Sequence, residues 1–343
     1  MEYPLVSIIT GYYNRKGNLN ESVGSILNQS YPNFEYIIFD DCSTDGTSEL
    51  LKKINDPRLK VLKYNKNEGF TKGIIRAIDK ANGEFIAIHG AGDISLKDRI
   101  KNQIKVLDRN KNIGIVGCLS TQFDGDVAYQ EQKKKFENSS EEFSLIRNFN
   151  SAIIYKNFFL HGEVMFRKSV YEKVGGYDPL YKYAQDRDLW VRMSNYCDAG
   201  IIQKVLYERG SYKNSVSRNF EKRIEQQFFT CLSREREIKG GDFNFAFRDK
   251  YEYLSEYAIQ SHYKHRKTLS LKEKKLLIDV AFNESSKVLN KLYCLFNNVI
   301  FINWLIFKIL VKKSFKYQLL LKENYGHLKR EEIYSLAVLR NKY

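Results

Sequence analysis

The stretch FDDCSTDGT at residues 39–47 decides the fold, because it joins a strand pattern to a helix pattern through a polar turn. Residues 35–40 (EYIIFD) form a short apolar run that predicts a buried strand, and residues 48–54 (SELLKKI) have the spacing of an amphipathic helix. Asp40 and Asp41 stand at the junction. This succession is typical of the edge of an α/β sheet at which ligands bind.

The same alternation extends to both sides of this stretch. Further strands are predicted over residues 6–10, 58–64, 84–89 and 113–119, and further helices over 19–29 and 72–81. Strands that alternate with helices at this spacing predict a mainly parallel central sheet flanked by helices. Polar residues gather where the strands end, at 12–14, 40–41 and 90–93.

Length and composition predict a folded chain with two parts. Its 343 residues exceed the roughly 250–300 that a single core usually holds, and 43% of them are hydrophobic. The pattern changes near residues 211–219, so we expect an α/β domain over 1–218 and a helical tail over 219–343. Within the first part, the polar segment 123–151 reads as a variable excursion near the site.

Cysteine usage and the N-terminal sequence bear on the location. The five cysteines lie far apart and form no C-x-x-C pair, which indicates ordinary thiols in a reducing compartment. The chain opens directly into a strand-like run, without the features of a secretory signal. We therefore expect a cytoplasmic protein, at the inner face of the cytoplasmic membrane if the tail binds there.

The tail carries much of the net charge of +15, because residues 261–343 hold 17 Lys and Arg against 6 Asp and Glu. A basic segment attracts anionic membrane surfaces, nucleic acid or phosphate-bearing substrates. It also contains the apolar stretch 292–311, which Asn and Lys residues interrupt. This stretch fits a buried helix, an interfacial helix at a membrane surface, or a membrane span.

Five motifs together carry a resemblance to a known family. They are VSIITGYYN (6–14), FDDCSTDGT (39–47), the run from NEGFTKG to GAGDIS (67–95), FLHGEVMFRKSVYEKVGGYD (159–178) and AQDRDLWVRM (184–193). In this order they resemble the family 2 glycosyltransferases of the GT-A fold over residues 4–218. The resemblance implies an inverting enzyme that moves a sugar from a nucleotide-sugar donor to a hydroxyl acceptor, in polysaccharide, lipid-linked glycan or glycoconjugate synthesis.

A nucleotide sugar presents a base, a ribose and a diphosphate, so its site needs a ring for stacking and carboxylates for hydrogen-bond donors. The resemblance places Tyr13 on the base and Asp41 on its ring N–H, with Thr10 and Asp40 beside them. The alternative is that the turn of residues 40–47 only caps the following helix. We expect Asp41 to bind the donor and residues 45–47 to act as the cap.

Two further polar residues have both a functional and a structural interpretation. Lys72, at the start of a predicted helix, could meet the donor phosphates together with backbone N–H groups. It could equally be a solvated surface lysine. His161 lines the acceptor side by resemblance, and the alternative is a structural histidine.

Asp186 matches the acid that the family uses as its catalytic base. Transfer with inversion needs a carboxylate opposite the leaving diphosphate, where it takes the proton of the acceptor hydroxyl. The alternative is that Asp186 caps the helix that begins there. For Asp188 we expect helix packing and a structural ion pair with Arg192.

The motif that usually binds a metal departs from the family pattern. Where the family has an Asp-x-Asp-Asp run for Mg²⁺ or Mn²⁺, this chain has GAGD at residues 90–93, so Gly90 and Gly92 replace expected acids. A divalent cation would have Asp93 as its one carboxylate. A histidine of the family that can join the metal is also missing, at residues 212–214. We therefore infer that basic side chains such as Lys72, Lys213 or Arg218 stabilise the charge of the leaving group, partly or wholly.

Three other function classes compete with this interpretation. A dehydrogenase would carry G-x-G-x-x-G after the first strand, where this chain has GYYN. A nucleic-acid-binding module lacks any helix-turn-helix, zinc or RNP pattern, so we expect no nucleic-acid partner. A non-catalytic member of the same fold, which only binds nucleotide sugars, is the main alternative, because the acidic motif is depleted.

Overall fold

The N-terminal half of the sheet is parallel. Its strands are β1 (Val6–Tyr12), β2 (Phe34–Asp40), β3 (Leu59–Lys63) and β4 (Phe85–Ile88). They pair in the order β3-β2-β1-β4 in the computed structural model, which describes residues 3–127 and 142–213 and the single residues 222, 226, 229, 230, 233 and 237. Because these strands run in the same direction, their carboxyl ends meet at one edge of the sheet.

The remaining strands make the other half of the sheet mixed. They are β5 (Ile94–Ser95), β6 (Ile113–Asp124), β7 (Phe143–Leu145), β8 (Met165–Arg167) and β9 (Asp198–Ser211). Strand β8 runs antiparallel between β4 and β6, and β6 pairs in parallel with β9. Both β5 and β7 are antiparallel to β9. The α/β sheet that the sequence predicts is confirmed, and beyond β4 its parallel and antiparallel pairs are mixed.

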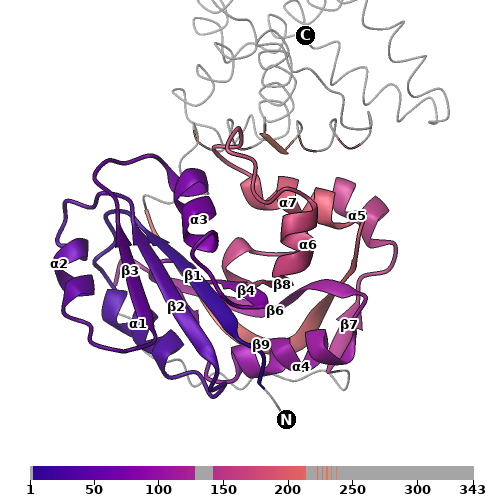
Figure 1. Cartoon of the computed structure of the whole chain (residues 1–343), viewed down its shortest axis with the longest axis horizontal. Helices are drawn as coiled ribbons and strands as arrows, with labels where there is room; N and C mark the ends of the chain where they lie inside the picture. Colours follow the sequence, from indigo (N-terminus) through magenta and orange to yellow (C-terminus); the bar gives the residue numbers. More distant parts are fainter. Residues whose placement is uncertain are drawn as a thin grey trace, which may run out of the picture. The chain divides into compact units, whose positions relative to one another are not determined.

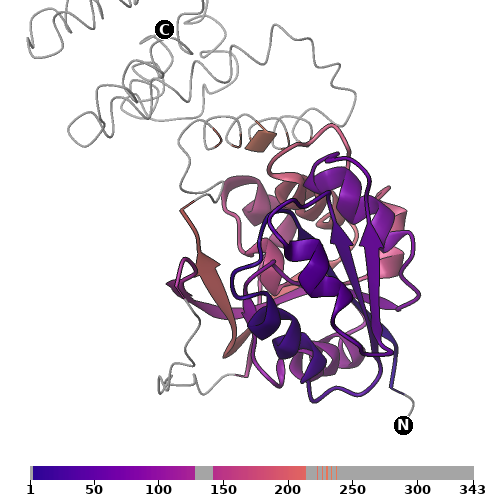
Figure 2. The same ribbon diagram turned by 90° about the vertical axis from the view of Figure 1, so that its left-hand side faces the viewer.

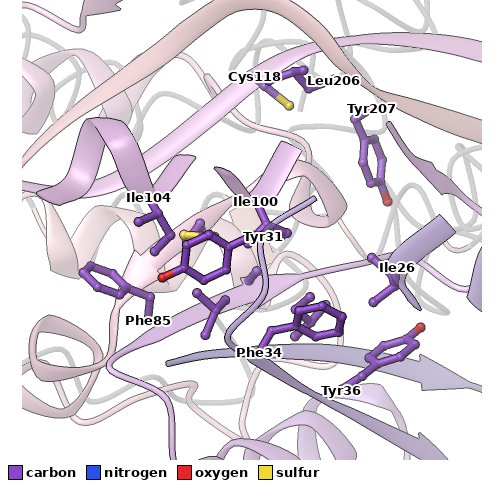
Figure 3. Packing of buried hydrophobic residues seen from close by; sticks show 14 of the residues in the cluster. Ile26, Tyr31, Phe34, Tyr36, Phe85, Ile100, Ile104, Cys118, Leu206 and Tyr207 are labelled. Atoms are coloured by element: carbon purple, nitrogen blue, oxygen red, sulfur yellow. The ribbon is translucent and has the colours of Figure 1, made fainter. Parts of the chain in front are cut away.

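Two layers of helices cover the sheet (Figure 1). One layer holds α1 (Leu19–Leu27), α2 (Thr47–Lys52) and α4 (Arg99–Arg109), and the other holds α3 (Phe70–Ile78), α5 (Phe149–Tyr155), α6 (Lys168–Lys173) and α7 (Gln185–Met193). Successive side chains of a strand point to opposite faces. On β1, Ile8 therefore joins the core cluster of Figure 3, while Ile9 joins the cluster on the other face.

The sequence placed the elements of the N-terminal half within a few residues of where they lie. Figure 2, the same diagram turned by 90°, shows this half in indigo and violet toward the viewer. The predicted excursion at 123–151 is shorter than expected, because β6 extends to Asp124, and β7 and α5 begin at Phe143 and Phe149. Residues 128–141 between them lie outside the described residues.

The predicted tail falls almost wholly outside the described residues, and so does the stretch 292–311. Residues up to Arg218 belong to one compact unit of the chain, and the domain boundary there stays a prediction. Among the helices that the structure describes, none has the length and apolar character needed to cross a bilayer.

Candidate active site

The ends of β1 and β2 carry the two residues predicted to hold a base. Tyr13 follows β1 and is 51% exposed, so its ring is available for stacking. Asp41 follows β2 and is 3% exposed. Its two carboxylate oxygens accept the backbone N–H groups of Glu68 and Gly69, each at 2.9 Å. Since a carboxylate oxygen has more than one lone pair, Asp41 retains capacity to accept a ligand N–H.

Thr10 and Asp40 lie beneath this surface. The Thr10 hydroxyl is hydrogen bonded to the Tyr36 hydroxyl at 3.0 Å, and its residue is 1% exposed. Asp40 has no exposed surface, and its carboxylate accepts the Ser43 N–H at 3.0 Å and the Ser48 hydroxyl. Both side chains are hydrogen bonded within the protein and support the strand ends, and their contact with the donor stays a prediction.

The start of α3 lies next to the end of β2 and forms another side of the candidate site. Phe70, its first residue, lies edge-on to His161 with ring centroids 5.5 Å apart. Lys72 is exposed two residues further along the helix. The Thr71 hydroxyl donates to the Tyr181 carbonyl at 2.6 Å, which holds α3 to the loop that precedes α7.

His161 and Asp186 form the opposite side. The His161 Nε2 lies 2.7 Å from the Tyr177 hydroxyl. Burial lowers the pKa of His161, and the negative charge of Asp186 opposes this, so the two side chains are within electrostatic reach. Ala184, with φ of 54°, is the N-cap of α7, so Asp186 is not the cap. Within the described part of the chain, no hydrogen bond or ion pair occupies the Asp186 carboxylate.

Two structural assignments from the sequence are confirmed. The Asp188 carboxylate is buried and forms an ion pair with Arg192 at 2.6 Å, one turn further along α7. The Asp45 carboxylate accepts the Thr47 N–H at 3.0 Å at the start of α2. These acids shape helices and are not available to a substrate.

Asp93 is held against β9. Its Oδ2 accepts the Tyr207 hydroxyl at 2.5 Å and its Oδ1 accepts the Gly210 N–H at 2.8 Å. The Tyr207 oxygen in turn accepts the Gly90 N–H at 2.9 Å. Burial raises the pKa of Asp93 to about 6. A Cβ added at Gly162 would lie 3.1 Å from the Gly90 nitrogen, so this loop also touches the His161 segment.

A buried polar network supports the loop of residues 90–93. His89 lies between the hydroxyls of Ser22 and Ser95, at 3.0 and 3.1 Å, and burial lowers its pKa well below the ordinary value. Arg99 is also buried, donates to Ser95 at 2.8 Å, and lies 4.9 Å from the centroid of the Tyr207 ring. No local pattern in the sequence predicts this network, because its members come from α1, the end of β4, β5 and α4 and meet only in the folded chain.

The comparisons with known proteins agree with this geometry. The family model for glycosyl transferase family 2 matches residues 7–175. This chain belongs to glycosyl transferase family 2. EpsE of Bacillus subtilis (strain 168), a protein named as a glycosyltransferase, is 26% identical over 278 residues, which cover 79% of this chain and 96% of EpsE.

Solved structures place this family 2 glycosyltransferase in the GT-A fold. The S. aureus protein TarS 1-349, solved in complex with UDP-GlcNAc, is similar with a TM-score of 0.58 and 20% identity, over 80% of this chain and 79% of TarS 1-349. The mannosyltransferase PcManGT of Pyrobaculum calidifontis, solved with GDP-Man and Mn²⁺, has a TM-score of 0.52 and 18% identity, over 87% and 89% of the two chains. At these identities the likeness shows the fold.

The residues of this family 2 glycosyltransferase do not fit a resident divalent cation. In the described ranges, no three His, Cys, Asp or Glu side chains are grouped so that they could hold a metal ion. Asp93, the one carboxylate of residues 90–93, is turned toward β9, where its two oxygens accept hydrogen bonds from Tyr207 and Gly210. Gly92 has φ of +82°, and a Cβ there would lie 2.0 Å from the Tyr212 hydroxyl oxygen, so an acid at this position would be strained and would clash.

The contacts join most of the predicted residues into one site. Asp41 holds the start of α3, where Phe70 meets His161, and His161 lies within reach of the charge of Asp186. The Asn14 N–H donates to the Ser43 hydroxyl at 2.9 Å, which ties the Tyr13 loop to the turn after β2.

Two residues that bear on the chemistry were not predicted. Arg15 lies beside the site, and its only signal in the sequence is a basic residue just after a strand end. Phe70 reads as an ordinary helix residue. Of the basic residues predicted for the leaving group, Lys213 is exposed and Arg218 lies outside the described residues.

Proposed function

We propose that the chain is an inverting glycosyltransferase that uses a nucleotide-sugar donor and a hydroxyl acceptor. The observation that carries this proposal is the partly exposed Asp186 carboxylate, which lies within electrostatic reach of His161 and has no partner among the described residues. The carboxylate takes the acceptor proton while the acceptor oxygen bonds to the anomeric carbon. The bond from that carbon to the diphosphate breaks, and its electron pair leaves with the phosphate oxygen.

The donor site is formed by the ends of β1 and β2 and the start of α3. Tyr13 stacks on the base, Asp41 accepts its ring N–H, and Lys72 faces the phosphates at the helix start. Uracil and thymine suit this pair of base contacts, because each has a ring N–H that can donate to a carboxylate. Guanine also offers N–H donors, so the comparison of UDP-, dTDP- and GDP-sugars below identifies the base.

The acceptor is a sugar or a lipid-linked sugar, as needed for polysaccharide, lipid-linked glycan or glycoconjugate synthesis. His161 lines this side of the site. The basic residues of 261–343 support attachment of the chain to the anionic inner face of the cytoplasmic membrane. Attachment there would confine the enzyme and a lipid-linked acceptor to the same plane.

The test compares wild type with Asp186→Asn, using release of nucleoside diphosphate from UDP-, dTDP- and GDP-sugars. We expect Asp186→Asn to lower the rate by about 10²- to 10⁴-fold, while donor binding, measured by thermal shift, stays unchanged. Asp79→Asn removes an exposed carboxylate at the far end of α3 and should keep the wild-type rate.

The outcomes separate the candidate functions. Donor binding without turnover in either protein would favour the non-catalytic member of the fold. If no nucleotide sugar binds wild type, both the catalytic and the non-catalytic function are contradicted.

A further inference from the structure

A narrow slot, filled by the ring of Tyr212, lies at the position where the family resemblance predicts metal ligands. The ring of Tyr212 lies among three glycines, and a Cβ at any of them would overlap it. The closest approaches would be 2.0 Å at Gly92, 2.5 Å at Gly125 and 2.5 Å at Gly210. The Tyr212 hydroxyl donates to the Gly92 carbonyl at 2.7 Å, which fixes the ring in this slot.

The slot explains two departures from the family pattern together. An aspartate at position 92 would need its Cβ where the Tyr212 hydroxyl lies, and Gly92 also has a positive φ. Tyr212 belongs to the segment in which the family has its metal-binding histidine. The Tyr212 ring therefore fills the space that an acid at position 92 would need, and it stands in the segment where the histidine is expected.

A cationic side chain, that of Arg15, stacks on the Tyr212 ring. The Arg15 guanidinium carbon lies 3.9 Å from the centroid of the Tyr212 ring, a stacking distance that stabilises a cation on an aromatic face. The Arg15 backbone is fixed as well, because its N–H donates to the Thr47 hydroxyl at 3.1 Å. Among the described residues, no carboxylate pairs with Arg15.

The position of Arg15 suits a diphosphate. Arg15 is half-buried and lies just after β1, two residues after Tyr13. Its positive charge acts to lower the pKa of Asp93. A guanidinium that stacks through its flat face keeps its N–H donors free at its edge, where they can bind phosphate oxygens in pairs. Such a cation is in place before the donor arrives, whereas a metal ion needs a set of ligands that the described residues of this site do not supply.

We propose that Arg15, stacked on Tyr212, binds the donor diphosphate in place of a divalent cation. This inference rests on the proposed function, because it needs a nucleotide sugar in this pocket. During transfer the Arg15 guanidinium holds the phosphate oxygen that receives the electron pair of the broken bond. The proton of the acceptor goes to Asp186.

The experiment measures affinity for UDP, GDP and dTDP, each paired with its nucleoside, in EDTA and in MnCl₂. The full-length wild type should bind one diphosphate equally well in both solutions. Arg15→Ala should weaken binding of that diphosphate by about 10- to 100-fold, because a charge-assisted pair is lost, and should change nucleoside binding by less than about twofold. Arg15→Lys should fall between the two, because it keeps the charge without the paired donors.

Lys16→Ala is the matched control, since it removes the same charge from the next residue, whose side chain is exposed; it should bind as wild type does. A wild type that binds diphosphate only with Mn²⁺ would overturn this inference and leave the proposed function intact. Unchanged diphosphate binding by Arg15→Ala would overturn it equally. If no nucleotide binds wild type in either solution, the proposed function itself fails.

Discussion

Glu163 shows how a single buried side chain sets a pH dependence. It follows His161 and Gly162 and is 4% exposed. Its Oε1 accepts the Leu160 N–H at 3.1 Å. Burial raises the pKa of Glu163 to about 7, and the hydrogen bond from Leu160 opposes this without cancelling it. The carboxyl group of the folded chain therefore keeps its proton at pH values where that of the unfolded chain has released it.

We expect Glu163→Gln to remove part of the pH dependence of stability. The stabilising effect of the raised pKa is complete below the ordinary glutamate value and is lost as the pH rises through about 7. Between pH 5 and 8 wild type should lose about 3 kcal/mol relative to Glu163→Gln, measured as the free energy of unfolding in urea at each pH. Glu21→Gln, an exposed change in α1, should keep the wild-type profile. Parallel profiles for wild type and Glu163→Gln would contradict the assignment.

At the scale of elements, α3 fits closely onto the sheet through two glycines. Phe39 of β2 is buried between Gly11 of β1 and Gly73 of α3. A Cβ at Gly11 would lie 2.2 Å from the Phe39 ring, and one at Gly73 would lie 2.3 Å from it. The close approach brings the start of α3 to the end of β2, where Asp41 receives the N–H groups of the loop before the helix.

Gly73→Ala should therefore destabilise the chain by about 1–3 kcal/mol, because the added methyl group overpacks the Phe39 ring. The matched control is Gly24→Ala in α1, where a Cβ meets nothing within 4 Å. That change should stabilise the chain by about 0.5–1 kcal/mol, since alanine favours a helix more than glycine does. Urea unfolding at one pH measures the free energy of unfolding of both variants. Equal effects of the two substitutions would show that the contact with Phe39 does not restrict α3.

The N-terminal elements could be predicted from the sequence because their signals are local. The strands β1, β2 and β4 are short apolar runs that are followed by polar residues, and this placed Tyr13 and Asp41 at the edge of the sheet. The pairings of β9 with β5, β6 and β7 involve segments far apart in the chain, so no local pattern announces them. The fixed position of Asp93 and the stacking of Arg15 on Tyr212 both depend on β9 or the residue after it. For that reason the sequence predicted the positions of Tyr13 and Asp41 at the strand ends more fully than the contacts of Asp93 and Arg15.

At the scale of the whole molecule, the charge is unevenly distributed along the chain. Residues 261–343 hold 17 basic and 6 acidic residues, and the apolar stretch 292–311 precedes Lys312, Lys313 and Lys316. Apolar residues next to lysines favour contact with an anionic membrane surface. A buried helix and a membrane span are the other two interpretations, and the segment lies outside the described residues.

We expect the full chain to bind vesicles that contain anionic lipid more tightly than neutral vesicles, and to release them as salt rises. Replacing Lys312, Lys313 and Lys316 by alanine should weaken this binding by at least about tenfold, because each lysine near the surface contributes about 1 kcal/mol. Replacing the exposed Lys52, Lys53 and Lys60 of the α/β domain removes the same charge and should have little effect. Cosedimentation with vesicles measures how tightly wild type and the two triple variants bind. Equal binding by the two triple variants would assign the attraction to net charge alone, and binding that resists both salt and substitution would favour a span.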